Sequence, residues 1–179
     1  MSFARRTSGS PTNVAAMDIV LRRSRADESD ALAALFRRSR TTAMPDLPPS
    51  HTPDEDRAYF RERVLASYDV WIAERGGEVA GFCATAPGWI EHLYVDPAHQ
   101  RVGVGSALLR RAISVESSLA LWTFRRNVNA CRFYEAHGFR VARTTEGDNE
   151  EREPDVLYVW APDSRRRDRA NRITSKRPP

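Results

Sequence analysis

The chain has 179 residues, a formal net charge of +4 and two cysteines, which is enough length for one domain with a sizeable buried core. No stretch approaches the roughly 18 consecutive apolar residues that a membrane span requires, and no apolar signal segment follows Arg5 and Arg6. Cys83 and Cys131 lack the spacing of a metal or redox motif. These features predict a cytoplasmic protein without a metal site, in which both cysteines are ordinary packing residues.

The basic charge is concentrated at the two ends of the chain. Residues 1–16 are rich in Ser, Thr, Pro and Gly and are predicted to be a disordered tail. Residues 163–179 carry seven basic and two acidic side chains and are predicted to be a second, basic tail. The single domain between them, residues 17–162, is therefore net acidic. Because the basic tail also lacks aromatic residues, it is only a weak indication of nucleic-acid binding.

The first half of the domain contains a strand, two helices and a proline-rich connection. Residues 18–22 are typical of a strand, and residues 27–40 have the apolar spacing of an amphipathic helix. Residues 41–53 hold four prolines and form a loop, which is either a lid over a pocket or a surface connection. Residues 54–66 predict a second helix. Its expected buried face holds Tyr59, Phe60, Val64 and Leu65.

The second half is dominated by strands. Glycine and proline turns join three expected antiparallel strands at 69–74, 78–85 and 89–95. The next strand, 119–124, is reached through a helix and should lie parallel to its predecessor. The remaining elements are a helix at 129–137 and strands at 139–142 and 156–160. This order predicts an α+β fold with a mixed, mostly antiparallel sheet flanked by helices.

Residues 91–112 combine a strand, a glycine turn and the start of a helix, in the pattern Q-x-x-G-x-G. The first N–H groups of a helix have no partner within it, and Gly103 and Gly105 would let an anion approach the backbone closely. The turn is not the dinucleotide fingerprint, because Leu108 stands where a third glycine is needed, and no Walker lysine follows. The pattern thus favours a phosphate site, the alternative being a tight turn that needs small residues for packing.

A second motif, N-x-x-A-x-x-F-Y-E-x-x-G-F, occupies residues 127–139. Together the two motifs resemble the GNAT superfamily of N-acetyltransferases, and the resemblance covers about residues 18–160. It implies the GNAT acyl-CoA N-acyltransferase fold and acetyl-CoA as the cofactor. In that fold the fourth and fifth strands splay apart, and the pantetheine arm lies in the gap between them.

The resemblance also implies which residues meet the cofactor. The fourth strand would pair with the pantetheine arm, the glycine turn would bind the pyrophosphate through backbone N–H groups, and an asparagine and a tyrosine would complete the site. The matching residues here are Leu93, Tyr94, Val95, Gln100, Arg101, Val102, Gly103, Val104, Gly105, Ser106, Asn127 and Tyr134. One departure is that many members have glycine where Arg101 stands and a basic residue where Val102 stands.

The implied reaction is direct attack of a primary amine of a small molecule or peptide on the acetyl thioester. Tyr134 is the predicted general acid, because a phenol is protonated at neutral pH and can donate to the departing thiolate. His92 is the predicted catalytic base, because a histidine titrates in the right range. The alternatives are Glu91 and Tyr94 of the same strand, His51 of the proline-rich loop, and transfer of the proton through water, as in many members of the family. Strict alternation places His92 and Tyr94 on one face of the strand and Glu91 on the other, with Leu93 and Val95. The alternative for Tyr134 is simple packing in the core.

Two loops are expected to choose the acceptor. His51 lies in the proline-rich loop, and Glu150 and Glu151 lie in an acidic run that would attract a cationic amine, unless that run is only a solvated loop. The competing function is a non-catalytic acyl-CoA-binding regulatory module of the same fold. The sequence leaves open the identity of the acceptor and whether the chain forms a homodimer through a sheet edge.

Overall fold

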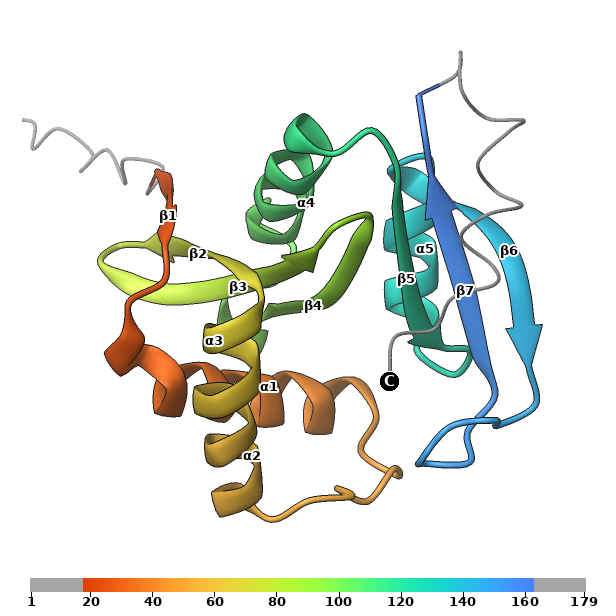
Figure 1. The fold of residues 1–179 in the computed structure, drawn as a ribbon, viewed down its shortest axis with the longest axis horizontal. Helices are drawn as coiled ribbons and strands as arrows, with labels where there is room; N and C mark the ends of the chain where they lie inside the picture. Colours follow the sequence, from red (N-terminus) through yellow and green to blue (C-terminus); the bar gives the residue numbers. More distant parts are fainter. Residues whose placement is uncertain (1–17, 163–179) are drawn as a thin grey trace, which may run out of the picture.

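The computed structural model describes residues 18–162, so both predicted tails lie outside the described residues. The described part is one seven-stranded mixed sheet with helices on both faces (Figure 1), which confirms the predicted fold class. The strands are β1 (Ile19–Arg23), β2 (Asp69–Arg75), β3 (Glu78–Ala86), β4 (Trp89–Val95), β5 (Leu119–Phe124), β6 (Arg140–Thr145) and β7 (Asp155–Trp160). The α-helices are α1 (Ser29–Ala43), α2 (Pro53–Tyr59), α3 (Leu65–Ser67), α4 (Val104–Val115) and α5 (Val128–Ala136).

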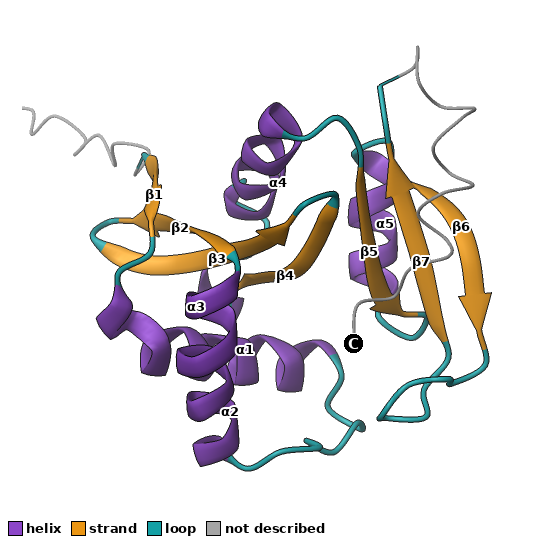
Figure 2. Cartoon of the chain, in the orientation of Figure 1, coloured by secondary structure: helices purple, strands orange, loops and turns teal. Residues whose placement is uncertain are grey.

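The strand order is β1-β2-β3-β4-β5-β7-β6, with antiparallel pairing everywhere except between β4 and β5. The predicted parallel pairing of these two strands is confirmed. It is confined to one point, where Trp89 pairs with Ala120. Beyond that point β4 stays with β3 and β5 stays with β7, so the sheet divides into two halves (Figure 2).

Two hydrophobic clusters fill the opposite faces of the sheet. On one face, α1 and the residues that follow α2 pack on β2 and β3. Leu32 of α1 and Phe60, directly after α2, are both fully buried there. On the other face, α4 and α5 pack through residues such as Leu108 and Tyr134. Gly81 of β3 permits the close approach of α4, because a Cβ there would lie 3.0 Å from Cγ1 of Val104. Phe60 and Val64 of the predicted buried face of the second helix are buried here, whereas Tyr59 of that face is 42% exposed.

Two backbone irregularities face each other across the first cluster. In β4, His92 pairs with Ala84 and Ile90 pairs with Thr85, so Glu91 is an extra, bulged residue. Opposite it, the chain after α2 forms a π-helical turn, η2 (Phe60–Val64), before it reaches α3. Neither irregularity follows from apolar periodicity, and both lie beside the cavity described below.

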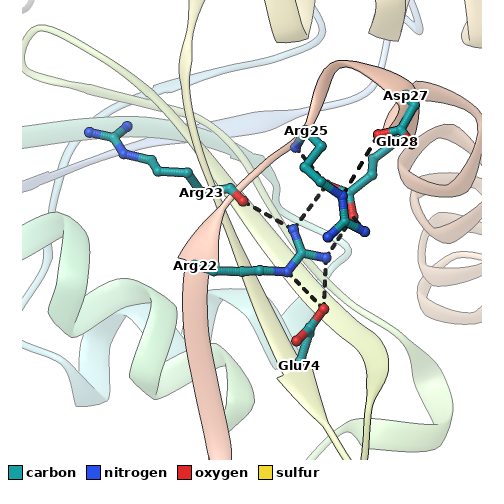
Figure 3. A network of polar contacts seen from close by, with 6 residues as sticks. All are labelled: Arg22, Arg23, Arg25, Asp27, Glu28 and Glu74. Carbon is teal, nitrogen blue, oxygen red and sulfur yellow. Dashed lines mark hydrogen bonds and ion pairs between the residues drawn. The ribbon is translucent and has the colours of Figure 1, made fainter.

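A network of charges ties β1 to its neighbours (Figure 3). Arg22 donates hydrogen bonds of 2.7 Å to Glu74 of β2 and of 2.6 Å and 3.0 Å to Glu28. Glu28 lies in the short 3₁₀ turn η1 (Ala26–Glu28) before α1, and it also accepts a bond of 2.7 Å from the backbone N–H of Arg25. The pKa of Glu28 is lowered, chiefly by the hydrogen bonds from Arg22. The network anchors the first strand and lies away from the gap in the sheet.

Candidate active site

The gap between β4 and β5 is the floor of a cavity of about 1230 Å³. One wall is the edge of β4 from Ile90 to Val95, which no described strand pairs with, and the other is Leu121–Phe124 of β5. An unpaired strand edge presents N–H and C=O groups that can bind an extended ligand as an added strand would. The cavity also reaches α1, α2, α5 and the turn before α4.

Most of the predicted site residues, whether implied by the resemblance or proposed from their chemistry, line this one cavity. They come from five separate segments and include both expected catalytic side chains. The lining members are His51, His92, Leu93, Tyr94, Val95, Gln100, Arg101, Gly103, Gly105, Ser106, Asn127, Tyr134, Glu150 and Glu151. Val102 and Val104 are outside the lining: the first is 44% exposed and the second is buried in the core. Only their backbone groups are therefore available to the predicted anion turn.

The N-terminus of α4 has the features of an anion site. Gly103 is its N-cap, with a φ of 96° that favours glycine, and no side chain caps the helix. The bond of 2.9 Å from the N–H of Ala107 to the carbonyl of Gly103 is the first of the helix, so the N–H groups of Val104, Gly105 and Ser106 have no helical acceptor. No acidic residue occupies this first turn. No acidic side chain of the first turn therefore offsets the positive end of the helix dipole at the cavity.

Arg101 adopts the left-handed conformation, with a φ of 61°. This is the position at which many GNAT members have glycine, so the departure noted in the sequence has a backbone consequence. An L-residue in this region carries steric strain of about 1 kcal/mol or more. Arg101 still lines the cavity beside the open turn, where its guanidinium can add a charge-assisted bond to an anion.

Burial makes His92 a weak base. Its ring lies among those of Phe36, Phe60 and Tyr94, and its Nε2 is 3.3 Å from the hydroxyl of Tyr59. This environment lowers the pKa of His92 to about 4. The imidazole is therefore neutral at neutral pH, but it has little affinity for a proton. That property argues against the prediction of His92 as the catalytic base.

The bulge also changes the orientation of Glu91. Ile90 packs in the same cluster as Leu93, on the α4 side, whereas His92 packs against the α1 side. Alternation is therefore interrupted at Glu91, and the prediction that Glu91 shares the face of Leu93 is wrong. Its carboxylate interacts electrostatically with Arg63 of the π-helical turn. Burial nevertheless raises the pKa of Glu91, which strengthens it as a base.

Tyr59 is a site residue that the sequence analysis placed in the core. It is 42% exposed, lines the cavity and contacts His92 at the junction of α2 and the π-helical turn. Burial of its hydroxyl raises the pKa of Tyr59 to about 12. The prediction that Tyr59 is buried is wrong, although Phe60 and Val64 of the same predicted face are fully buried.

Tyr134 of α5 lies on the other side of the gap, where its side chain is 6% exposed and lines the cavity. Its ring is 5.3 Å from that of Phe133 and 6.0 Å from that of Tyr158. Burial raises the pKa of Tyr134 well above its usual value, so the phenol keeps its proton at any ordinary pH. The Tyr134 side chain is thus packed in the core, as the alternative interpretation of this residue predicts, and it also lines the cavity.

Asn127 has a structural role as the N-cap of α5, in addition to any contact with a ligand. Its side-chain oxygen accepts a hydrogen bond of 3.2 Å from the N–H of Ala130 and caps α5. The amide also lines the cavity. A change at Asn127 would therefore affect both the helix and the site.

The two loops expected to choose the acceptor meet across the mouth of the cavity. His51 Nε2 is 3.3 Å from Glu150 Oε1, and Arg40 Nη2 is 2.7 Å from Glu151 Oε1. Glu151 is thus compensated by a nearby arginine, which the sequence analysis missed, whereas Glu150 stays exposed. The arrangement supports the interpretation of the proline-rich loop as a lid. Figure 1 shows the two loops approaching each other below the gap in the sheet.

Other classes of site are less well supported by the described residues. Between residues 18 and 162, no three His, Cys, Asp or Glu side chains converge as metal ligands would. Over the same range, no helix has the length and apolar character needed to cross a membrane. Burial raises the pKa of the Cys83 thiol to about 12, which makes it a poor nucleophile.

Comparison with known proteins agrees with this geometry. Residues 66–141 match the family model for the Acetyltransferase (GNAT) domain. The peptidyl-lysine N-acetyltransferase YjaB of Escherichia coli is 31% identical over 138 residues, which cover 74% of this chain and 90% of YjaB. The chain belongs to the GNAT superfamily of N-acetyltransferases.

Two further matches define how far the similarity extends. The uncharacterized N-acetyltransferase YafP of Escherichia coli is 35% identical over 88 residues, which span 49% of this chain and only 56% of YafP. The solution structure of apo YjaB from Escherichia coli has a TM-score of 0.67, with 27% identity over 80% of this chain and 98% of that one. The PaiA N-acetyltransferase of Thermoplasma acidophilum in complex with coenzyme A also has a TM-score of 0.67, with 18% identity over 82% of this chain and all of that one. This GNAT chain therefore shares the family fold across its described domain.

Proposed function

We propose that this chain transfers an acetyl group from acetyl-CoA to a primary amine of a small molecule or peptide by direct attack. The proposal rests on one observation: two features that can each bind part of the cofactor lie in the same cavity. An unpaired β4 edge and the uncapped N-terminus of α4 lie next to each other, as a pantetheine arm and its diphosphate would require. The structure of PaiA with coenzyme A supports the same cofactor for this fold.

The residues present fit this cofactor on physical grounds. The N–H groups of Val104, Gly105 and Ser106 can bind the diphosphate, and Arg101 can add a positive charge. The free edge of β4 can pair with the amide groups of the pantetheine arm. When bound there, acetyl-CoA supplies an electrophilic thioester to the acceptor.

The chain's own groups then orient the reactants and move two protons. Glu91 receives the proton of the attacking amine, directly or through water, as the carbon–nitrogen bond forms. Tyr134 gives its phenolic proton to the sulfur as the carbon–sulfur bond breaks. A free N–H of the β4 edge donates to the carbonyl oxygen, where negative charge develops. Most of the rate enhancement would come from holding amine and thioester together in the cavity.

The acceptor lies on the side of α1 and α2 in this proposal. Tyr59, Glu91 and His92 form an aromatic and acidic surface there, which suits the ammonium group and apolar stem of a lysine side chain. The names of the YjaB relatives make peptide lysine the first acceptor class to test. The exposed charge of Glu150 would favour cationic acceptors at the cavity mouth.

The decisive experiment has two steps. Calorimetry with coenzyme A tests the cofactor site, and thiol release from acetyl-CoA over a panel of amines tests the reaction. Transfer to a lysine peptide or a small amine is expected. Binding without thiol release for any amine would favour the regulatory module, and absence of coenzyme A binding would refute the proposal.

A further inference from the structure

The last turn of α5 is joined to the first turn of α4 by a histidine outside the cavity lining. His137 Nδ1 lies 2.7 Å from the carbonyl oxygen of Phe133, and its Nε2 lies 2.9 Å from Oγ of Ser106. The ring centroids of His137 and Phe133 are 4.4 Å apart. Phe133 in turn packs against Gly105, where an added Cβ would be 3.4 Å from the phenyl ring. Phe133 and His137 thus contact Gly105 and Ser106, two adjacent residues of the turn proposed to bind the diphosphate (the anion turn, residues 100–106).

The direction of these hydrogen bonds follows from the groups involved. The carbonyl of Phe133 can only accept, so Nδ1 of His137 carries a hydrogen. In the neutral ring Nε2 then has a lone pair and accepts from the hydroxyl of Ser106. This fixes the Ser106 side chain, whose hydroxyl could otherwise bond to nearby backbone groups and compete with the helix. The backbone N–H of Ser106 remains the group that faces an anion.

We propose that His137 is a positioning residue for the anion turn and acts through Ser106. By holding the first turn of α4 against α5, it keeps the open N–H groups of that turn aimed at the diphosphate of coenzyme A. This inference rests on the proposed function, because it assumes that the turn binds that diphosphate. His137 is outside the cavity lining, and it contacts three lining residues: its side chain contacts Ser106 and Phe133, and its backbone N–H donates a hydrogen bond of 3.0 Å to the carbonyl of Tyr134.

Two substitutions at His137 separate the positioning role from a purely structural one. His137→Gln places an amide where Nε2 lies and can keep the bond to Ser106, whereas His137→Asn can replace only Nδ1 and keep the bond to Phe133. Calorimetric dissociation constants for coenzyme A should rise about 3- to 10-fold in His137→Asn and in Ser106→Ala, the loss typical of one hydrogen bond. His137→Gln should remain near wild type. If the only role of His137 is to cap the C-terminus of α5, His137→Gln will bind coenzyme A more weakly than His137→Asn. That result would overturn the inference.

A truncated donor gives a second readout. S-acetylpantetheine carries the thioester but lacks the diphosphate, so its kcat/KM should be the same in wild type and His137→Asn, while that of acetyl-CoA falls. Equal losses for both donors would show a general disturbance of the fold and overturn the inference. The double variant Ser106→Ala/His137→Asn should bind coenzyme A no worse than either single variant, because both remove one interaction. Wild-type protein that fails to bind coenzyme A would refute the proposed function and this inference together, whereas unchanged binding in His137→Asn would refute this inference alone.

Discussion

Arg40 Nη2 lies 2.7 Å from Glu151 Oε1, and this ion pair joins the two halves of the divided sheet across the cavity. Arg40 lies in the last turn of α1 in one half, and Glu151 belongs to the loop between β6 and β7 of the other. Their side chains are only 16% and 15% exposed, so both charges depend on each other. The neighbouring pair of His51 and Glu150 spans the same mouth but is open to solvent.

The difference in burial predicts a difference in stability. Glu151→Gln leaves the guanidinium of Arg40 without its counter-charge, and we expect the free energy of unfolding to fall by about 3 kcal/mol. Glu150→Gln is the matched control and should change it by less than about 1 kcal/mol, because exposed ion pairs contribute little. Urea unfolding of the two variants checks this. Equal losses would mean that the buried pair does not connect the halves.

His92 should make the folded state sensitive to mild acid. Its pKa is about 4 in the fold and 6.5 in the unfolded chain, so below pH 6.5 the unfolded state binds a proton that the folded state rejects. The stability contributed by the neutral ring is present above pH 6.5 and is lost as the pH falls toward 4. The loss between pH 7.5 and 5 should be about 2 kcal/mol.

His92→Phe provides the control, since it removes the titrating group and keeps an aromatic ring among Phe36, Phe60 and Tyr94. Urea unfolding at the two pH values should show a smaller decrease for this variant than for wild type. The same decrease in both proteins would show that His92 does not titrate with a lowered pKa.

Arg101 permits a test that separates backbone strain from charge. Arg101→Gly removes both the guanidinium and the strain at φ 61°, whereas Arg101→Ala removes only the guanidinium. The glycine variant should therefore be more stable than the alanine variant by about 1 kcal/mol. Both should bind coenzyme A more weakly than wild type and to a similar degree, because both lack the same charge. Thermal unfolding and calorimetry check the two halves of this prediction, and equal stability would argue against the left-handed conformation.

Local patterns in the sequence predicted most of the fold and most of the residues that line the cavity near α4 and α5. Apolar spacing predicted the helices that bury Leu32 and Leu108, and the two motifs predicted the turn at Gly103 and the tyrosine at 134. These features are local, so a short stretch of residues is enough to reveal them.

The proposed acceptor side of the cavity includes features that local sequence patterns do not contain. The bulge at Glu91 needs the register between two strands, and neither the π turn nor the exposure of Tyr59 follows from the helical period on which the prediction relied. The partnership of Arg40 with Glu151 joins residues far apart in sequence. Burial then changed the chemistry of His92, which residue type alone placed in the range of a useful base.

Glu91 should control the acidic side of the pH–rate profile. The proposed base works as a carboxylate, so kcat/KM should fall as the pH drops through its pKa, which burial places above the usual range for Glu. Glu91→Gln should remove this limb and lower kcat by about 100-fold. His92→Phe should keep the limb at the same pH. Loss of the limb in His92→Phe and its retention in Glu91→Gln would return the base role to His92.

Tyr134 lies across the cavity from Glu91, and its role as an acid predicts a specific kinetic change. Tyr134→Phe keeps the ring packed against Phe133 and Tyr158 but removes the proton that the sulfur would receive. We expect kcat to fall by about 100-fold while the dissociation constant of coenzyme A stays within about twofold of wild type. Because burial holds the pKa of the phenol well above its usual value, wild type should show no loss of rate from Tyr134 deprotonation in the ordinary assay range. An activated acetyl thioester with a more acidic leaving thiol needs less protonation, so it should recover most of the activity of Tyr134→Phe. A variant that turns over acetyl-CoA at the wild-type rate would leave Tyr134 as a packing residue of the core.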